Sequence, residues 1–208
     1  MMKAVPNKNH SLLWFGPIAA LLLFTGIFAI GLMTPGYSHI RQTVSELGEA
    51  GSPGRIVFSV LLSIVAACLI VFAGGVARTL REAGYSTLPA YFVGAMAISA
   101  AGVGIFAYPH PLHNVFGMSE LAGYQAPLVA ALVCRTASNA RQLTRFSIVM
   151  YALVMLAIAA NLTTLDRHGD LWAHIRPFYG VVQRLLFAAW FFWCAGYAAL
   201  LMRMRRPG

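Results

Sequence analysis

Two histidines and one glutamate stand close together in a largely apolar part of the chain, at His110, His113 and Glu120. His110 and His113 are three residues apart, and Glu120 lies seven residues after His113, so on a helix the three side chains share one face. Two imidazoles and one carboxylate are a reasonable ligand set for zinc or another divalent metal ion. The alternative is an interfacial loop, stiffened by Pro109 and Pro111, whose imidazoles face water. Because a carboxylate in an apolar zone is costly unless it is paired, we expect Glu120 to have a partner.

A second group of titratable residues lies between positions 166 and 176, which read Asp-Arg-His-Gly-Asp-Leu-Trp-Ala-His-Ile-Arg. Asp170 and His174 are four residues apart, and an aspartate beside a histidine can orient the imidazole as a base or as a metal ligand. Asp166 is the candidate general base of this group. The same pattern also fits a solvated loop with surface salt bridges, which stabilise a protein only weakly.

An arginine inside an apolar run is the third candidate. Gln183 and Arg184 stand about two turns inside the last apolar run of the chain. A buried arginine needs a counter-charge, a site lined by carbonyl groups, or a path along which its side chain reaches water. Glu46, Glu120 or a lipid phosphate would serve as the counter-charge. A role in anion binding and a structural ion pair both remain open.

The most polar stretch runs from Tyr37 to Arg55, and we call it the lid segment. Its apolar and polar residues recur at helical spacing, which predicts a short amphipathic helix that ends at Gly48 in a left-handed conformation. Ser52 and Pro53 then fit the cap and the first position of the next helix. The candidate site residues of the lid segment are His39 and Arg41 for ligand binding, Ser45 as a nucleophile and Glu46 as a base.

The elements that must position these residues are apolar helices. The chain has 208 residues, of which 59% are hydrophobic and 10% charged, and its mean hydropathy is +0.71. Soluble domains carry about 25% charged residues, so this composition indicates one integral membrane domain over residues 1–208. Six runs are long enough to cross the hydrocarbon core as helices, which predicts an all-α, six-helix transmembrane bundle. The six are residues 12–33, 56–77, 88–108, 115–134, 146–165 and 178–202.

The charges of the connecting segments predict the orientation. Ten lysines and arginines lie at the helix ends that are on the same side of the membrane as the two termini. Four lie at the helix ends on the other side. The positive-inside rule therefore places both termini in the cytoplasm and the lid segment outside the inner (plasma) membrane. The net charge of +9 is explained by this distribution, so we do not expect a nucleic-acid partner. Membrane lipids are the expected partners, together with a possible partner protein in a membrane complex.

Three motifs resemble a known family of membrane proteins. They are Tyr-Ser-His-Ile-Arg-Gln-Thr-Val-Ser-Glu-Leu-Gly with the following Gly-Ser-Pro in the lid segment, Tyr-Pro-His-Pro-Leu-His at 108–113, and Gly-Val-Val-Gln-Arg at 180–184. Together they resemble the bacterial and archaeal proteins grouped as domain of unknown function 998, over about residues 16–202. The resemblance implies a six-helix integral membrane protein and implies no activity.

A second likeness concerns site composition alone. Alkaline ceramidases and adiponectin-receptor-like proteins place a serine, an aspartate and three histidines around zinc at one membrane face. Here Ser45, Asp166, His110, His113 and His174 supply similar residue types. The chain departs from that pattern because its two close histidines are three residues apart, not four, and lie outside the last helix.

Two functions follow from these residues. The favoured one is a lipid or small-molecule binder, a transport component or an accessory subunit, in which His39, Arg41, Gln183 and Arg184 contact the ligand. The alternative is a metal-dependent hydrolase or lipid-modifying enzyme at the outer leaflet, with Asp166 or Glu46 as base. The enzyme requires the metal ligands to converge within about 4–5 Å, because metal–ligand bonds are near 2 Å. The hypothesis of a binding protein predicts an apolar groove or lateral opening lined by Arg184.

Overall fold

The computed structural model describes residues 8–135 and 140–204, and within these ranges the regular structure is entirely helical. The long helices are α2 (Phe15–Met33), α3 (Arg55–Glu82), α4 (Leu88–Ile105), α7 (Arg141–Asn161) and α9 (Tyr179–Arg203). The shorter α-helices are α1 (Lys8–Leu13), α5 (Pro111–Gly123), α6 (Ala126–Cys134) and α8 (Asp170–Ile175). Single 3₁₀ turns occupy Ser45–Gly48, Leu162–Leu165 and Arg176–Phe178.

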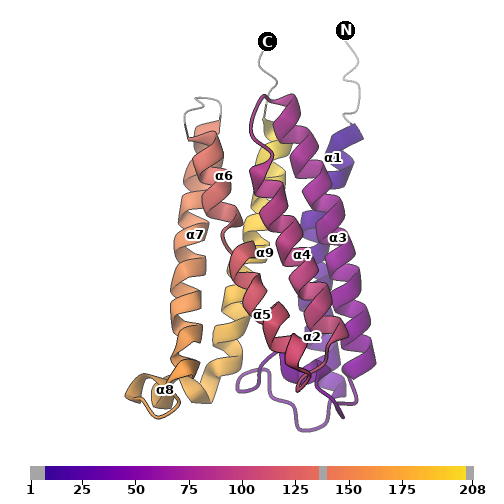
Figure 1. The fold of residues 1–208 in the computed structure, drawn as a ribbon, viewed down its shortest axis with the longest axis vertical. Coiled ribbons are helices and arrows are strands. Elements are labelled where there is room, and N and C mark those ends of the chain that lie inside the picture. The colour runs from indigo at the N-terminus through magenta and orange to yellow at the C-terminus, as the bar shows by residue number, and fades with distance from the viewer. Residues whose placement is uncertain (1–7, 136–139, 205–208) are drawn as a thin grey trace.

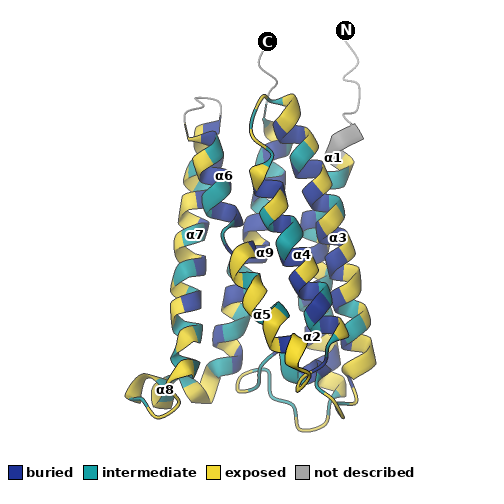
Figure 2. Ribbon diagram, viewed as in Figure 1, coloured by how far each residue is buried: buried dark blue, intermediate teal, exposed yellow. Residues whose placement is uncertain are grey.

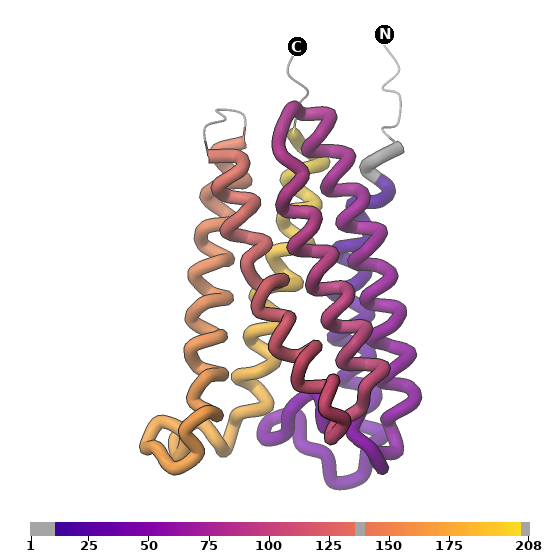
Figure 3. The backbone as a smooth tube through the Cα atoms, in the orientation of Figure 1, coloured from indigo at the N-terminus to yellow at the C-terminus, as the bar shows by residue number. Residues whose placement is uncertain are grey.

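The helices form an upright bundle in which α9 links two groups (Figures 1 and 3). On one side α3 packs against α2 and α4, and α4 packs against α5. On the other side α6 packs against α7. Helix α9 contacts both α2 and α7 and so lies between the two groups. The start of α1 and the end of α9 lie at one end of the bundle, and the lid segment and α8 lie at the other (Figure 1).

Figure 2 shows exposed positions along the outside of the helices, and many of these positions hold large apolar residues. Five helical stretches of the described chain are long and apolar enough to cross a membrane: residues 11–33, 55–82, 88–105, 141–165 and 170–203. Large side chains such as Leu21, Leu156 and Phe192 are each more than 60% exposed. Lipid solvates such a surface where water would not, which is the arrangement expected of a multi-pass membrane protein.

The sequence predicts one helix over residues 115–134, but the structure has two helices there. Helix α5 ends at Gly123 and α6 begins at Ala126, and the two follow each other along the bundle (Figure 1). Pro127 has no N–H to donate to the carbonyl of Gly123, so the helical hydrogen bond is missing there. The indole Nε1 of Trp190 donates to that carbonyl at 3.0 Å instead. A proline together with a substitute donor from α9 therefore explains the break.

The prediction of an amphipathic helix in the lid segment is wrong. Only Ser45–Gly48 is helical there, as one 3₁₀ turn, and Gly48 does not adopt a positive φ. Gly48 is instead required by packing, because a Cβ atom would collide with the ring of Phe58. The next helix begins at Arg55, two residues beyond the predicted first helical position at Pro53, and the Ser52 hydroxyl donates to the Leu47 carbonyl at 2.8 Å. The other predicted boundaries differ from the observed helices by a few residues.

Candidate functional site

The lid segment is ordered from within by Glu46. Its carboxylate accepts hydrogen bonds from the backbone N–H and the hydroxyl of Thr43, at 2.8 and 2.9 Å, and from the amide of Gln42 at 2.7 Å. The amide oxygen of Gln42 in turn accepts from the N–H of Ser38 at 2.8 Å. These bonds close the segment into a compact loop. They also occupy both oxygens of Glu46, the residue that the sequence offered as a base.

Arg184 of α9 fastens this loop to the bundle. Its guanidinium donates to the carbonyl of Gln42 at 3.0 Å, to the carbonyl of Gly180 at 2.8 Å, to the Tyr37 hydroxyl, and to Nδ1 of His39 at 3.2 Å. All four partners are neutral, so the cation is held by dipoles and by the nearby ring of Tyr37, whose centroid lies 5.8 Å away. Of the environments that the sequence left open for this arginine, the structure shows the carbonyl-lined site.

His39 is enclosed beside Arg184. Its ring stacks on Phe28 of α2, with centroids 5.3 Å apart, and meets Tyr37 edge-on at 5.2 Å. Gly31 leaves the room for it, because a Cβ atom there would overlap the imidazole. Since Nδ1 accepts from Arg184, the neutral ring carries its proton on Nε2, a buried atom on the side of the ring away from Arg184. Burial, reinforced by the charge of Arg184, lowers the pKa of His39.

The lid backbone also lies directly on α9. The side-chain oxygen of Gln183 accepts the N–H of Val44 at 2.6 Å, and the N–H of Val181 donates to the carbonyl of Ile40 at 3.2 Å. Gly180 permits this approach, since a Cβ atom would come within 3.0 Å of the carbonyl oxygens of three lid residues. The structure thus brings together three predicted site residues, His39, Gln183 and Arg184, with Glu46 joined to them through Gln42.

Two other lid candidates lie outside this cluster. Arg41 is exposed, and its side chain contacts none of the cluster residues. The Ser45 hydroxyl is 3.1 Å from that of Thr43, and no histidine is in position to activate it. The structure therefore gives no support to Ser45 as a nucleophile or to Arg41 as part of the cluster.

The predicted metal ligands do not converge. His110 accepts the N–H of Leu112 at its own helix start, and His113 bonds through Nδ1 to the carbonyl of Phe106 at 2.8 Å. Glu120 accepts from the hydroxyl of Tyr124 at 3.1 Å. Within residues 8–135 and 140–204, no three side chains of His, Cys, Asp or Glu gather into a group that could hold a metal ion. The ligand set read from the spacing is thus not assembled.

Asp166 belongs to a separate loop at the same end of the bundle (Figure 1). Its carboxylate accepts the N–H of His168 at 3.2 Å, and the residue is exposed. His174 bonds through Nδ1 to the backbone carbonyl of Asp170, not to its carboxylate. This segment matches the solvated-loop alternative.

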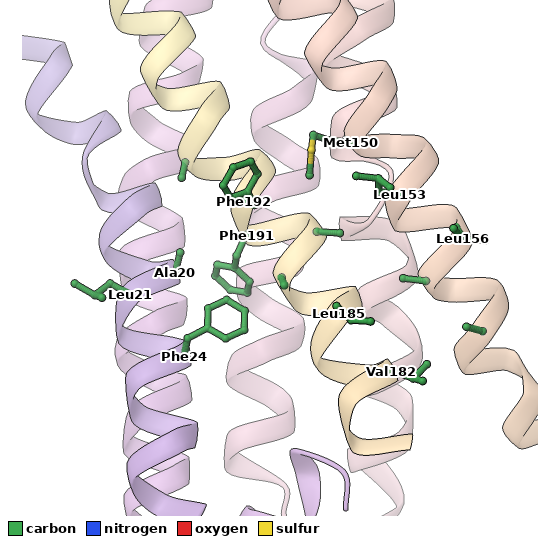
Figure 4. A pocket seen from close by; sticks show the side chains of 15 residues that line it. Ala20, Leu21, Phe24, Met150, Leu153, Leu156, Val182, Leu185, Phe191 and Phe192 are labelled. Atoms are coloured by element: carbon green, nitrogen blue, oxygen red, sulfur yellow. The ribbon is translucent and has the colours of Figure 1, made fainter. Parts of the chain in front are cut away.

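An apolar groove lies between α2, α7 and α9 (Figure 4). It has a volume of about 800 Å³, with α9 as its floor and α2 and α7 as its walls. Phe24 and Phe191 meet edge-on at 6.3 Å and line its α2 side. Its lining on α7 and α9 includes Met150, Leu156, Val182, Leu185 and Phe192. The binder hypothesis expected such a groove, but Arg184 does not line it.

Sequence reasoning missed residues whose roles depend on distant partners. Tyr37 marked only the start of the lid segment, yet its hydroxyl accepts from Arg184 and donates to the carbonyl of Thr43 at 2.8 Å. Gln42 and Gly180 carried no chemical signal of their own. Their presence in motifs shared with the resembled family was the available clue. The groove had no sequence signal, because apolar residues line it and also the lipid-facing surface.

Comparison with known proteins gives a family and no activity. The family model described as "Protein of unknown function (DUF998)" matches residues 17–200, so the chain belongs to this family. The resemblance seen in the sequence is thereby confirmed. Neither the curated proteins nor the solved structures gave a match.

Proposed function

We propose that this member of the DUF998 family binds one acyl chain of a membrane lipid in the groove between α2, α7 and α9. The observation that carries the proposal is the lining of the groove, which comes from fifteen residues of three helices, all of them apolar. A volume of about 800 Å³ falls within the range of ligand pockets, about 300–1,000 Å³. The groove is flanked by helices that would be immersed in lipid, so acyl chains are the most abundant apolar ligands available to it.

The length of the groove fits half a membrane. On α7 it extends from Met150 to Ala160, which corresponds to about 15 Å of helix. The hydrocarbon core is about 30 Å thick, so this is about the depth of one leaflet. On α7 the lining residues lie in the half of the helix that leads to α8, which is at the lid end of the bundle. A lipid bound there would come from the leaflet on the lid side.

The lid segment would hold α9 in place for this ligand. Gln183 and Arg184 bond the lid, while the neighbouring Val182 and Leu185 line the groove. The same turn of α9 therefore serves both features. We further propose six crossings, with α5 and α6 together as the fourth, and both termini in the cytoplasm, which would make the bound lipid one of the outer leaflet. The charge distribution of the sequence supports this orientation.

Native mass spectrometry of purified protein tests the proposal. After delipidation, phosphatidylglycerol is titrated back, and the first lipid adduct is compared between wild type and variants. Ala157→Trp and Ala188→Trp each place an indole in the groove, and we expect the first adduct to weaken by several-fold.

The matched control is Ala159→Trp, which adds the same side chain at an exposed position of α7 outside the groove. It should bind lipid like the wild type. Equal binding by all three variants, with unchanged thermal stability, would refute an acyl chain in this groove.

A further inference from the structure

Glu120 is a carboxylate with few neighbouring groups that could balance its negative charge. It lies one turn before the break between α5 and α6. Its carboxylate accepts a hydrogen bond from the hydroxyl of Tyr124 at 3.1 Å. Within the described residues, no lysine, arginine or histidine forms an ion pair with it. This part-buried carboxylate in an apolar stretch thus has a neutral phenol as its hydrogen-bond partner.

The surroundings of Glu120 are polar only at the break itself. Tyr124 is 3% exposed, and its neighbour Gln125 accepts a hydrogen bond from Tyr151 of α7 at 3.0 Å. On the α4 side, the hydroxyls of Ser99 and Ser119 are 2.7 Å apart. None of these groups carries a charge at neutral pH. The described parts of α4, α6, α7 and α9 therefore supply no charged partner for the carboxylate.

Backbone carbonyls at the break are already in use. The carbonyl of Gly123 accepts from Trp190, and that of Leu121 accepts from the side chain of Gln125 at 3.1 Å. A divalent ion such as Ca²⁺ takes 6–8 oxygen ligands, which this site does not offer. One carboxylate beside one phenol oxygen offers too few ligands for a metal ion and suits a proton, which needs a single carboxylate oxygen. An ionised group within a membrane is costly unless it is neutralised, so such a ligand stabilises the site.

We propose that Glu120 is a membrane-embedded proton-binding site at the break between α5 and α6. Met118 and Leu121 beside Glu120 are exposed, so the carboxyl group lies near the lipid-facing surface of α5. The site is independent of the lipid groove, since Glu120 does not line it. Ion binding at a broken helix is an arrangement that membrane transporters use.

Dicyclohexylcarbodiimide provides the test, because it reacts with protonated carboxyl groups in apolar surroundings. Full-length protein in nanodiscs is labelled from about pH 5 to about pH 9, and the peptide that contains Glu120 is quantified by mass spectrometry. We expect the labelling rate to fall about tenfold per pH unit above the midpoint of the titration. Protection by NaCl, and not by choline chloride at equal ionic strength, would identify Na⁺ as the ligand and overturn the assignment of a proton.

Two variants make the result decisive. Glu120→Gln should remove the label from this peptide, which assigns the signal. Tyr124→Phe removes a hydrogen bond that favours the charged carboxylate, so labelling should persist to higher pH than in the wild type. A labelling rate that is constant across the pH range, or no labelling at any pH, would overturn the proposal, because the carboxyl group would then not exchange its proton.

Discussion

At the scale of single residues, His39 is held neutral by its neighbours. Its Nδ1 accepts a hydrogen bond from Arg184, and protonation there would place two cations 3.2 Å apart. The pKa of His39 is lowered from 6.5, first by burial and then by Arg184. Because the folded protein resists a proton that the unfolded chain accepts, stability should fall as the pH drops below about 6.5 toward the folded-state pKa.

The test compares the apparent Tm of wild type and His39→Gln between about pH 5 and about pH 7.5. Glutamine keeps an acceptor for Arg184 but does not titrate. The wild type should lose more stability on acidification than the variant does. Both proteins carry the other histidines unchanged, so their contribution cancels in the difference. Parallel curves would contradict the assigned role of His39.

The second prediction at the scale of single residues concerns Gly180. Gly180→Ala would push a Cβ atom against lid carbonyls, and backbone cannot move aside as easily as a flexible side chain. We expect a loss of about 1–3 kcal/mol in the free energy of unfolding, as for overpacking in a core. Detergent unfolding followed by circular dichroism measures it.

The control for Gly180→Ala is Gly94→Ala in α4, where a Cβ atom meets nothing within 4 Å. Alanine has the higher helix propensity, so this variant should be unchanged or more stable by up to about 1 kcal/mol. If both alanine variants behave alike, the tight contact between the lid and Gly180 is not significant in the folded protein.

At the scale of elements, the sequence predicts what local hydropathy controls and misses what distant contacts control. The apolar runs predict the long helices because crossing hydrocarbon requires about 20 residues each. The lid segment has helical spacing, yet Arg184 and Gln183 bond its backbone from about 140 positions away. These long-range bonds replace helical ones, so periodicity alone could not predict the loop. The site was predictable in part, since polar residues in an apolar run marked Gln183 and Arg184.

The break between α5 and α6 supports a double-mutant prediction. Trp190→Phe removes the donor to the Gly123 carbonyl and should cost about 1–3 kcal/mol from that unsatisfied group, besides any loss of packing. Pro127→Ala restores the backbone N–H that a continuous helix would use. In the double variant this N–H can satisfy Gly123, so the combined loss should be smaller than the sum.

Unfolding by sodium dodecyl sulfate gives the four free energies of this cycle. The packing loss is the same in Trp190→Phe and in the double variant, so the coupling energy isolates the hydrogen bond. Trp14→Phe, at a position that is 56% exposed, is the control for tryptophan removal and should change little. Additive effects, within about 0.5 kcal/mol, would mean that Trp190 does not substitute for the missing N–H.

At the scale of the whole molecule, the two ends of the bundle differ in chemistry. The lid segment, the His110–His113 turn and α8 lie at one end, and the start of α1 and the end of α9 lie at the other (Figure 1). The α7 side of the lipid groove lies in the half of that helix nearer α8, and Glu120 lies one turn before the break between α5 and α6. Orientation in the membrane therefore decides which leaflet and which aqueous compartment each proposed site meets.

Labelling of single cysteines in intact cells tests that orientation. Ala50→Cys lies in the lid segment and Ser86→Cys in the turn between α3 and α4, both at exposed positions. We expect a membrane-impermeant maleimide to label Ala50→Cys in intact cells and Ser86→Cys only after permeabilisation, since the positive-inside rule places the basic ends in the cytoplasm. The parent protein is the background control, because Cys68, Cys134 and Cys194 are buried. The reverse labelling pattern would mean the opposite orientation in the membrane, with the lipid groove in the cytoplasmic leaflet. Labelling of both positions from the same side would contradict the arrangement of α3 as a membrane-spanning helix.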